Sequence, residues 1–271
     1  CLFSCFLTGR KFVTTFHGTY NFSNRIKKFY NSVMLRSDLV IAGSNFIFDH
    51  IHKNYNNNLK YGKRVLVIFR GINTEYFSNS TVTNEKVNKI NLDLGLRSEN
   101  FKILLPGRLT RWKGQEMFLE ALYILKNKFS KNNFQSIILG SHQGRKVYYK
   151  KLLSITEQYK LQKNVIFLQN FKEMPIMYYI SDIVVSSSIE PEAFGRVSVE
   201  AQSMEKIIIA SAIGGSNETI KEGKTGYLFK SGDPKSLSEK ILKALSLDEI
   251  ALKSMGVEGR KNIVQKFNVE K

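Results

Sequence analysis

Ile183–Ala201, with the sequence IVVSSSIEPEAFGRVSVEA, decides the fold class of the chain. The stretch begins with the apolar run Ile183–Val185, which is typical of a strand buried in a parallel sheet. A loop with Pro191 and Gly195 follows, and the pattern then predicts a helix over Val197–Met204. A strand, a loop and a helix in this order form the repeating unit of an α/β protein.

The same unit recurs along the whole chain of 271 residues. The predicted strands are Phe12–Phe16, Leu39–Ala42, Val65–Phe69, Lys102–Leu105, Ser136–Leu139, Val165–Leu168, Ile183–Val185, Ile207–Ala210 and Tyr227–Phe229. In the N-terminal part, one predicted helix is capped by Ser23 and has apolar residues on one face, and a second starts at Ser44. The other predicted helices are Gly114–Phe129, Lys146–Tyr159, Met174–Ile180, Val197–Met204, Asn217–Lys221 and Asp233–Leu245, and more helix follows the last of these. This alternation predicts two Rossmann-like domains, each a parallel sheet wound on both sides.

A polar stretch separates the two predicted domains. Asn79–Asn100 is rich in Asn, Thr, Ser and Lys and has only isolated apolar residues, so it is the best candidate for a linker. We therefore expect an N-terminal domain over residues 1–88 and a C-terminal domain over residues 89–271. Ligands of such folds bind at the carboxyl ends of the strands and in the cleft between domains.

Composition excludes several classes of protein. Hydrophobic residues make up 42% of the chain, which is ordinary for a globular protein. No apolar run reaches the roughly 18 residues of a membrane span. Only Cys1 and Cys5 are present, with four histidines, which argues against a disulfide framework and against a metal enzyme.

The chain is strongly basic, with 41 Lys and Arg against 23 Asp and Glu and a net charge of +18. A basic balance is compatible with a solvated surface, an anionic membrane face or nucleic acid. The lysines are scattered and no nucleic-acid-binding motif is present, so the first two interpretations are favoured.

A first candidate loop runs from Gly107 to Gly114 (GRLTRWKG) and leads into a predicted helix. Glycine lets a backbone approach a ligand, and a helix N-terminus attracts anions. Arg108 offers a planar fork for phosphate oxygens and Lys113 offers a point charge. The alternative is an exposed basic turn without function.

Two further candidate loops follow strands in the C-terminal half. The loop after Ile183–Val185 contains Glu192, and Glu200 lies in the early part of the helix that follows. The turn between these two carboxylates has backbone N–H groups that suit a phosphate. A carboxylate also suits adjacent hydroxyls of a sugar or ribose. The second loop contains Gly214 and Gly215, which permit close backbone approach, although a plain turn would look the same.

Four motifs in order carry a resemblance to a known family. They are FHG at Phe16–Gly18, GRLTRWKG at Gly107–Gly114, EAFGRVSVEA at Glu192–Ala201 and GGSNE at Gly214–Glu218. Together they resemble the retaining glycosyltransferases of family 4, which have the GT-B fold of two facing Rossmann-like domains. The chain starts at Cys1 instead of Met and ends directly after a helical pattern, so we expect a fragment that lacks the N-terminal start and the C-terminal end, with an incomplete N-terminal domain.

The resemblance implies a role for each matching residue. Arg108 and Lys113 would hold the donor diphosphate as it leaves, Glu192 would contact the donor sugar, and Glu200 would bind the ribose hydroxyls. His17 would lie near the reaction centre on the acceptor side. The remaining residues expected to contact the donor are Gly107, Phe194, Gly195, Arg196, Val197, Gly214, Gly215 and Glu218. The resemblance implies neither a metal nor a cofactor apart from the nucleotide-sugar substrate.

The expected function is transfer of a sugar, with retention, from a nucleotide-diphosphate sugar to a glycan or lipid-linked acceptor in bacterial surface polysaccharide or lipopolysaccharide synthesis. The expected location is cytoplasmic, with a possible anionic membrane surface as partner and without nucleic acid. Two alternatives stay open: another GT-B-like enzyme, such as a nucleotide-sugar epimerase or a phosphorylase, and a non-catalytic module that binds anions or nucleic acid. A two-carboxylate hydrolase is disfavoured because Glu200 is predicted to be helical and the loop before it to bind an anion.

Overall fold

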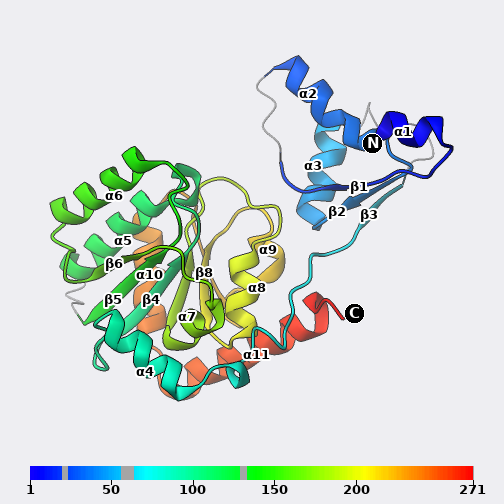
Figure 1. Ribbon diagram of the computed structural model, residues 1–271. Coiled ribbons are helices and arrows are strands. Elements are labelled where there is room, and N and C mark those ends of the chain that lie inside the picture. The colour runs from blue at the N-terminus through cyan, green and yellow to red at the C-terminus, as the bar shows by residue number, and fades with distance from the viewer. Residues whose placement is uncertain (20–23, 56–63, 129–132, 271) are drawn as a thin grey trace.

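The computed structural model describes residues 1–19, 24–55, 64–128 and 133–270, and these form two separate parallel sheets (Figure 1). The first sheet has the order β1-β2-β3, and parallel pairs join its neighbouring strands. Its strands are β1 (Val13–Phe16), β2 (Leu39–Ala42) and β3 (Arg64–Val67), and its helices are α1 (Leu2–Leu7), α2 (Arg25–Ser32), the 3-10 helix η1 (Val33–Arg36) and α3 (Asn45–Tyr55).

The register of the first sheet places three loops at one edge. Phe16, at the end of β1, pairs with Ala42, and Ala42 pairs with Val67. The strands therefore end together, and the chain leaves each of them on the same side of the sheet. His17, Ser44 and Arg70 follow these ends.

The second sheet has six strands in the order β6-β5-β4-β7-β8-β9, and all pairs are parallel. Its strands are β4 (Phe101–Pro106), β5 (Phe134–Leu139), β6 (Val165–Leu168), β7 (Ile183–Ser186), β8 (Ile207–Ser211) and β9 (Gly226–Phe229). Its helices are η3 (Asn79–Thr81), α4 (Asn84–Asp93), η4 (Arg111–Lys113), α5 (Gln115–Lys128), α6 (Lys146–Gln158), α7 (Met174–Ile180), α8 (Arg196–Ser203), α9 (Ser216–Thr219), α10 (Pro234–Leu245) and α11 (Glu249–Phe267).

Helices cover both faces of the second sheet, as the sequence predicted (Figure 1). One core forms between the sheet and α5, α6 and α10, and includes Phe118, Leu122 and Ile241. The other core forms on the opposite face against α7, α8 and the end of α11, and includes Tyr178 and Ile263. The β7-to-α8 segment thus carries its loop to the carboxyl edge of a fully covered sheet.

The predicted linker contains a helix, α4, that the sequence analysis does not predict. The Thr83 side chain caps this helix by accepting a hydrogen bond from the Lys86 backbone N–H. Val87, Ile90 and Leu94 recur at helical spacing and pack against the second core. Three apolar residues in a polar stretch are enough to dock a short helix, and a composition window misses them.

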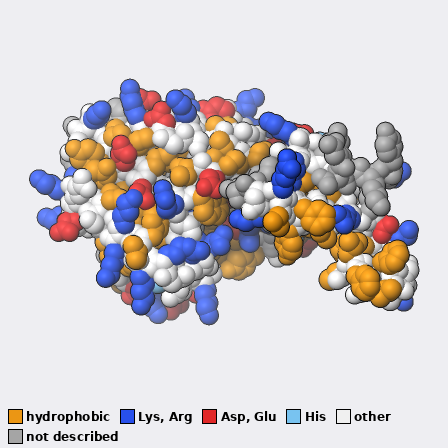
Figure 2. All heavy atoms as spheres, turned by 90° about the horizontal axis from the view of Figure 1, so that it is seen from above, with side chains coloured by type: hydrophobic (Ala, Val, Ile, Leu, Met, Phe, Trp, Pro, Cys, Tyr) orange, Lys and Arg blue, Asp and Glu red, His pale blue; other side chains and the backbone are white. Residues whose placement is uncertain are grey.

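The helix predicted after the first strand forms, but its apolar face is not buried. Asn24 caps it by accepting from the Lys27 backbone N–H, whereas the predicted cap, Ser23, lies outside the described residues. Ile26 is 79% exposed, Phe29 59% and Tyr30 77%. Figure 2 shows hydrophobic side chains gathered on the N-terminal part of the surface, toward the right of the view.

The last helix returns to the segment that leaves the first sheet (Figure 1). The Ile72 backbone N–H donates to the Phe267 carbonyl at 2.8 Å, and the Val269 N–H donates to the Ile72 carbonyl at 3.1 Å. The rings of Phe69 and Phe267 meet edge to face with centroids 5.4 Å apart. Ile72 and Phe77 already belong to the second core, so the end of α11 holds the connection in place. Among the described residues, no helix has both the length and the hydropathy that a bilayer span requires.

Glycines bring the loops of the carboxyl edge into backbone contact. A Cβ on Gly140 would lie 1.9 Å from the Gly107 carbonyl oxygen, and one on Gly114 would lie 2.0 Å from the Ser187 carbonyl oxygen. Gly114 also has φ +72°, in the left-handed region. The loop after β4 therefore packs against the loops after β5 and β7 only because these positions lack a side chain.

We expect Gly114→Ala to lower the free energy of unfolding by about 2 kcal/mol or more, through a left-handed alanine and a clash with backbone. Urea unfolding would measure the change. Gly95→Ala is the matched control, because Gly95 has φ +59° but nothing within 4 Å of an added Cβ. That control should lose only about 1 kcal/mol. Equal losses in both variants would contradict the close packing at Gly114.

Candidate active site

Three loops at the carboxyl edge of the second sheet contain the residues singled out from the sequence. They follow β4, β7 and β8, and β4 and β7 are neighbours at the centre of the sheet. Backbone hydrogen bonds join them: the Ile189 N–H donates to the Trp112 carbonyl at 2.8 Å, and the Gly215 N–H donates to the Glu192 carbonyl at 2.9 Å. The three loops therefore form one continuous surface.

Lys113 and Glu192 form an ion pair at the centre of this surface. The Lys113 Nζ lies 2.7 Å from Glu192 Oε1, and each side chain is only 13% exposed. The Ser188 hydroxyl also donates to the Glu192 carboxylate at 2.5 Å. Lys113, predicted to bind phosphate, and Glu192, predicted to contact the sugar, thus hold each other in position. The spacing of the two residues along the sequence does not reveal this contact.

Arg108 lies beside this pair and is exposed. Its guanidinium carbon is 5.9 Å from the centroid of the Trp112 ring, and Lys113 Nζ is 4.5 Å from the same centroid. Both contacts are cation–π interactions, which orient the two positive side chains. The fully buried Gln115 fixes the backbone here by donating through Nε2 to the Arg108 carbonyl at 2.8 Å.

Glu200 is a buried carboxylate, so an exposed helix position is excluded for it. It is 8% exposed, accepts a hydrogen bond from the Tyr178 hydroxyl at 2.7 Å, and pairs with Arg196 at 3.1 Å. Burial raises the pKa of the Glu200 carboxyl, while the Tyr178 hydrogen bond and the charges of Arg196 and Lys113 oppose that rise. Burial and the adjacent carboxylate in turn raise the pKa of Tyr178.

The predicted glycines make close contacts around the start of α8. Gly195 precedes the helix with φ +83°, and a Cβ there would lie 3.4 Å from the Ser216 hydroxyl. A Cβ on Gly214 would lie 2.4 Å from the Glu192 carbonyl oxygen, and one on Gly215 would lie 2.5 Å from the Phe194 Cα. Gly214 and Gly215 therefore let the loop after β8 support the loop that carries Glu192.

Other expected donor contacts are placed nearby. A Cβ on Gly107 would meet the Lys113 side chain at 3.6 Å. The Phe194 side chain is buried against Phe267, with centroids 5.5 Å apart, which leaves its backbone as the available part. Val197 is buried in the first turn of α8.

Glu218 joins the second domain to the first. Its Oε1 accepts from the Phe46 backbone N–H at 2.7 Å, and its Oε2 accepts from the backbone N–H and the side-chain amide of Asn45, each at 2.9 Å. The Ser44 hydroxyl donates to the Ala193 carbonyl at 2.5 Å beside it. A carboxylate at a helix N-terminus is favourable, so Glu218 of the second domain caps α3 of the first. Its predicted role toward the donor stays a prediction.

His17 is exposed at the end of β1 and contacts Arg70, which follows β3. A guanidinium only donates hydrogen bonds, so Nδ1 of His17 accepts, and a neutral ring carries its proton on Nε2. The Arg70 side chain lies over Gly43, where a Cβ would be 3.6 Å from its Cγ. Among the described residues, no hydrogen bond joins His17 to Arg108, Lys113 or Glu192.

Four supporting residues were not identified from the sequence: Gln115, Tyr178, Ser188 and Arg70. Tyr178 lies in an apolar helix and looks like a core residue, and no local pattern links it to Glu200. Gln115 is the exception, because its place directly after the predicted loop Gly107–Gly114 could have marked it as a supporting residue. The described residues contain no group of three or more His, Cys, Asp or Glu side chains placed to hold a metal ion.

Two α/β domains with parallel sheets, and a site at the carboxyl edge of the second sheet, form the GT-B architecture, as the sequence predicted. A family model described as "Glycosyl transferases group 1" matches residues 87–262, and one described as "Glycosyltransferase Family 4" matches residues 1–76. The chain therefore belongs to the group 1 glycosyl transferases, and its first 76 residues match family 4.

Several proteins are similar to the chain in sequence or in fold. The capsular polysaccharide biosynthesis glycosyltransferase CapM of Staphylococcus aureus is 28% identical over 80% of this chain, and the match covers 55% of CapM. A crystal structure of a glycosyltransferase from Rickettsia africae is 35% identical, with a TM-score of 0.88 over 98% of this chain and 69% of that one. Anabaena Alr3699/HepE in complex with UDP-glucose has a TM-score of 0.86 at 24% identity, over 99% of this chain and 71% of that one. The chain thus spans about half the length of CapM.

The raised pKa of Glu200 predicts a specific pH dependence of stability. The folded protein holds the Glu200 proton more tightly than the unfolded chain, whose carboxyl has a pKa near the ordinary 4.5. Stability from this group is therefore lost as pH rises from about 4.5 through the raised pKa. Glu200→Gln removes the effect, so the wild type should lose stability relative to this variant between pH 4.5 and 7.

Urea unfolding of both proteins across this pH range would measure the difference. The matched control is Glu99→Gln, which alters an exposed carboxylate. The difference from wild type should change more with pH for Glu200→Gln than for Glu99→Gln. A flat difference for Glu200→Gln would mean that Tyr178 and Arg196 fully offset the cost of burial.

Proposed function

We propose that the protein works as a retaining, metal-independent glycosyltransferase that takes a sugar from a nucleotide-diphosphate sugar. The observation that carries the proposal is the cluster of Arg108, Lys113 and Glu192 beside the N-terminus of α8. A cation pair, a helix N-terminus and a fixed carboxylate together suit a diphosphate with a hydroxyl-bearing sugar attached.

Charge stabilisation of the leaving group is the chemical step that these residues support. When the glycosyl–phosphate bond breaks, negative charge builds on the departing diphosphate. Arg108 and Lys113 are already oriented by Trp112, so they would stabilise that charge with little reorganisation. Protein cations would then do the work that a divalent metal does in other sites.

Recognition of the donor would be divided between two carboxylates. Glu192, held by Lys113 and Ser188, would accept hydrogen bonds from sugar hydroxyls. Glu200, held by Tyr178, would accept them from the ribose. The HepE structure, which contains UDP-glucose, makes UDP-sugars the first donors to test.

The first domain would receive the acceptor. His17 would present its Nε2 toward the cleft, with Arg70 fixing the tautomer from behind. The similarity to CapM favours a glycan or lipid-linked acceptor in surface polysaccharide synthesis. A glycosidase role is disfavoured, because Lys113 and Tyr178 engage the two carboxylates separately.

Nucleotide binding without metal tests the donor site. In EDTA, UDP at about 100 times its dissociation constant should stabilise the protein by about 2.7 kcal/mol. Thermal unfolding with UDP, GDP, ADP and CMP would identify the base. Lys113→Ala should weaken the preferred nucleotide by about ten- to a hundredfold, because a charge-assisted hydrogen bond is lost.

Arg64→Ala is the matched control, since Arg64 is an exposed arginine on the first sheet. It should leave nucleotide affinity unchanged. A folded protein that no nucleotide stabilises, or one that responds equally after Lys113→Ala, would contradict the proposed donor site. The anomeric configuration of the product, read by NMR with a UDP-sugar, would separately test retention.

A peripheral position at an anionic membrane is also proposed. Its support is the net charge of +18 together with α2, where exposed Ile26, Phe29 and Tyr30 stand among basic residues. Basic amphipathic helices lie in the plane of a membrane interface.

Co-sedimentation with vesicles that contain phosphatidylglycerol would test this second part. Wild type should bind at low salt, and Ile26→Ser with Phe29→Ser should lose most of the binding. The matched control is Leu92→Ser, at a position that is 81% exposed on the other domain. Absence of wild-type binding at low salt would rule the membrane role out.

A further inference from the structure

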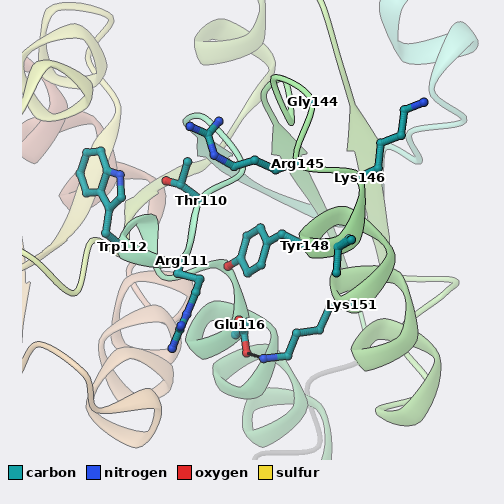
Figure 3. Close-up of a pocket in the computed structure, with 10 residues that line it drawn as sticks. Thr110, Arg111, Trp112, Glu116, Gly144, Arg145, Lys146, Tyr148 and Lys151 are labelled. Atoms are coloured by element: carbon teal, nitrogen blue, oxygen red, sulfur yellow. Dashed lines mark hydrogen bonds and ion pairs between the residues drawn. The ribbon is translucent and has the colours of Figure 1, made fainter.

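A cavity of about 830 Å³ lies beside the loop after β4, outside the candidate donor site (Figure 3). Its walls come from η4, the first turn of α5 and the first turns of α6. These helices cover one face of the sheet, whereas Glu200 and Tyr178 lie on α8 and α7 on the opposite face. None of the expected donor-binding residues lines this cavity.

The cavity carries a positive charge. Arg111, Arg145, Lys146 and Lys151 line it, and Glu116 is the acidic residue among them. Glu116 pairs with Lys151 at 2.5 Å, which leaves Arg111, Arg145 and Lys146 in excess. Figure 3 shows the Arg145 side chain above the Tyr148 ring and the Arg111 side chain below it, with their guanidinium groups extending away from each other. Guanidinium groups of this kind suit a phosphate or carboxylate.

A buried hydroxyl without a partner also lines the cavity. Thr110 is only 6% exposed, and its Oγ1 has no hydrogen-bond partner among the described residues. Buried polar atoms are nearly always hydrogen-bonded, so an unpaired hydroxyl beside a cavity points to a missing partner. A small movement of the Thr110 side chain on ligand binding would let a sugar hydroxyl supply one.

Two aromatic rings complete the wall. The Tyr148 hydroxyl donates to Gln115 Oε1 at 3.3 Å, which fixes its ring against the cavity. Trp112 stands at the edge toward the donor site, with Lys113 Nζ 4.5 Å from its centroid. Aromatic faces pack against the apolar C–H face of a sugar ring, while hydroxyls and charges around them set its orientation.

We propose that this cavity is a second carbohydrate site, which binds a monosaccharide unit that carries a phosphate or a carboxylate. Arg111 or Arg145 would bind the anionic group, Glu116 the hydroxyls, and Trp112 with Tyr148 the ring. The site is separate from the proposed donor site, and the two share the Trp112 side chain as a common wall. The ligand is a free sugar phosphate or a charged sugar within a longer glycan, since both present the same chemistry.

The chain offers a direct probe, because Trp112 is its one tryptophan. Titration with glucose 6-phosphate and with glucuronate should change the tryptophan fluorescence in a saturable manner. Glucose and inorganic phosphate should each bind at least tenfold more weakly, since each supplies only part of the chemistry. A preference for glucuronate would favour a carboxylated sugar, and a preference for glucose 6-phosphate a phosphorylated one.

Variants assign the signal to the cavity. Arg111→Ala with Arg145→Ala should weaken both charged sugars at least tenfold, and Lys150→Ala, an exposed lysine on the same helix α6, should not. Thr110→Val keeps the shape but removes the hydroxyl. It should weaken the sugars several-fold and leave inorganic phosphate unaffected.

Competition with UDP separates this site from the donor site. The charged sugars should still bind when UDP is saturating, and UDP should still bind the double arginine variant. The proposal is overturned if the charged sugars give no saturable change. Displacement by UDP, equal affinity in the double variant, or inorganic phosphate binding as tightly as the charged sugars would overturn it as well. Failure of UDP itself to bind would bear on the proposed function alone.

Discussion

The ion pair between Lys113 and Glu192 constrains the loops around it. Each charge is largely withdrawn from water, and an isolated charge in that position would cost several kcal/mol. The loops after β4 and β7 must therefore stay within one hydrogen-bond length of each other. Gly114 permits this, because a side chain there would meet the Ser187 backbone, and Gly214 lets the loop after β8 approach Glu192 in the same way. The ion pair in turn fixes the positions of the two loops that carry it. Arg108, Trp112 and the start of α8 lie beside it.

The second sheet holds these loops in place through the strands that precede them. β4 and β7 are adjacent and central, with helices on both faces, so their ends cannot shift independently. Glu200 adds a second fixed carboxylate on the opposite side of the sheet from α5, anchored by Tyr178. The second sheet thus presents positive side chains and hydrogen-bond acceptors at its carboxyl edge in fixed positions. Such preorganised groups can stabilise charge without rearranging.

Much of this fold could be predicted because buried parallel strands appear as uninterrupted apolar runs. Val165–Leu168 and Met174–Ile180 were found with the predicted bounds. Helix α4 was missed because its few apolar residues are diluted by polar ones. The site was predicted as loops and residue types, but the partners were not: Tyr178 and Glu200, or His17 and Arg70, meet only through the tertiary fold, and no local spacing encodes such contacts.

Glu218 stabilises the arrangement of the two domains in the structure. One carboxylate accepts three N–H groups at the start of α3, and moving the domains apart would return all of them to solvent. A hydrogen bond to a charged group is worth about 1.5–3 kcal/mol, so this contact alone makes separation of the two domains unfavourable. A movement of one domain away from the other would have to uncover the N-terminus of α3 first, so one side chain of the second domain contributes to the rigidity of the first.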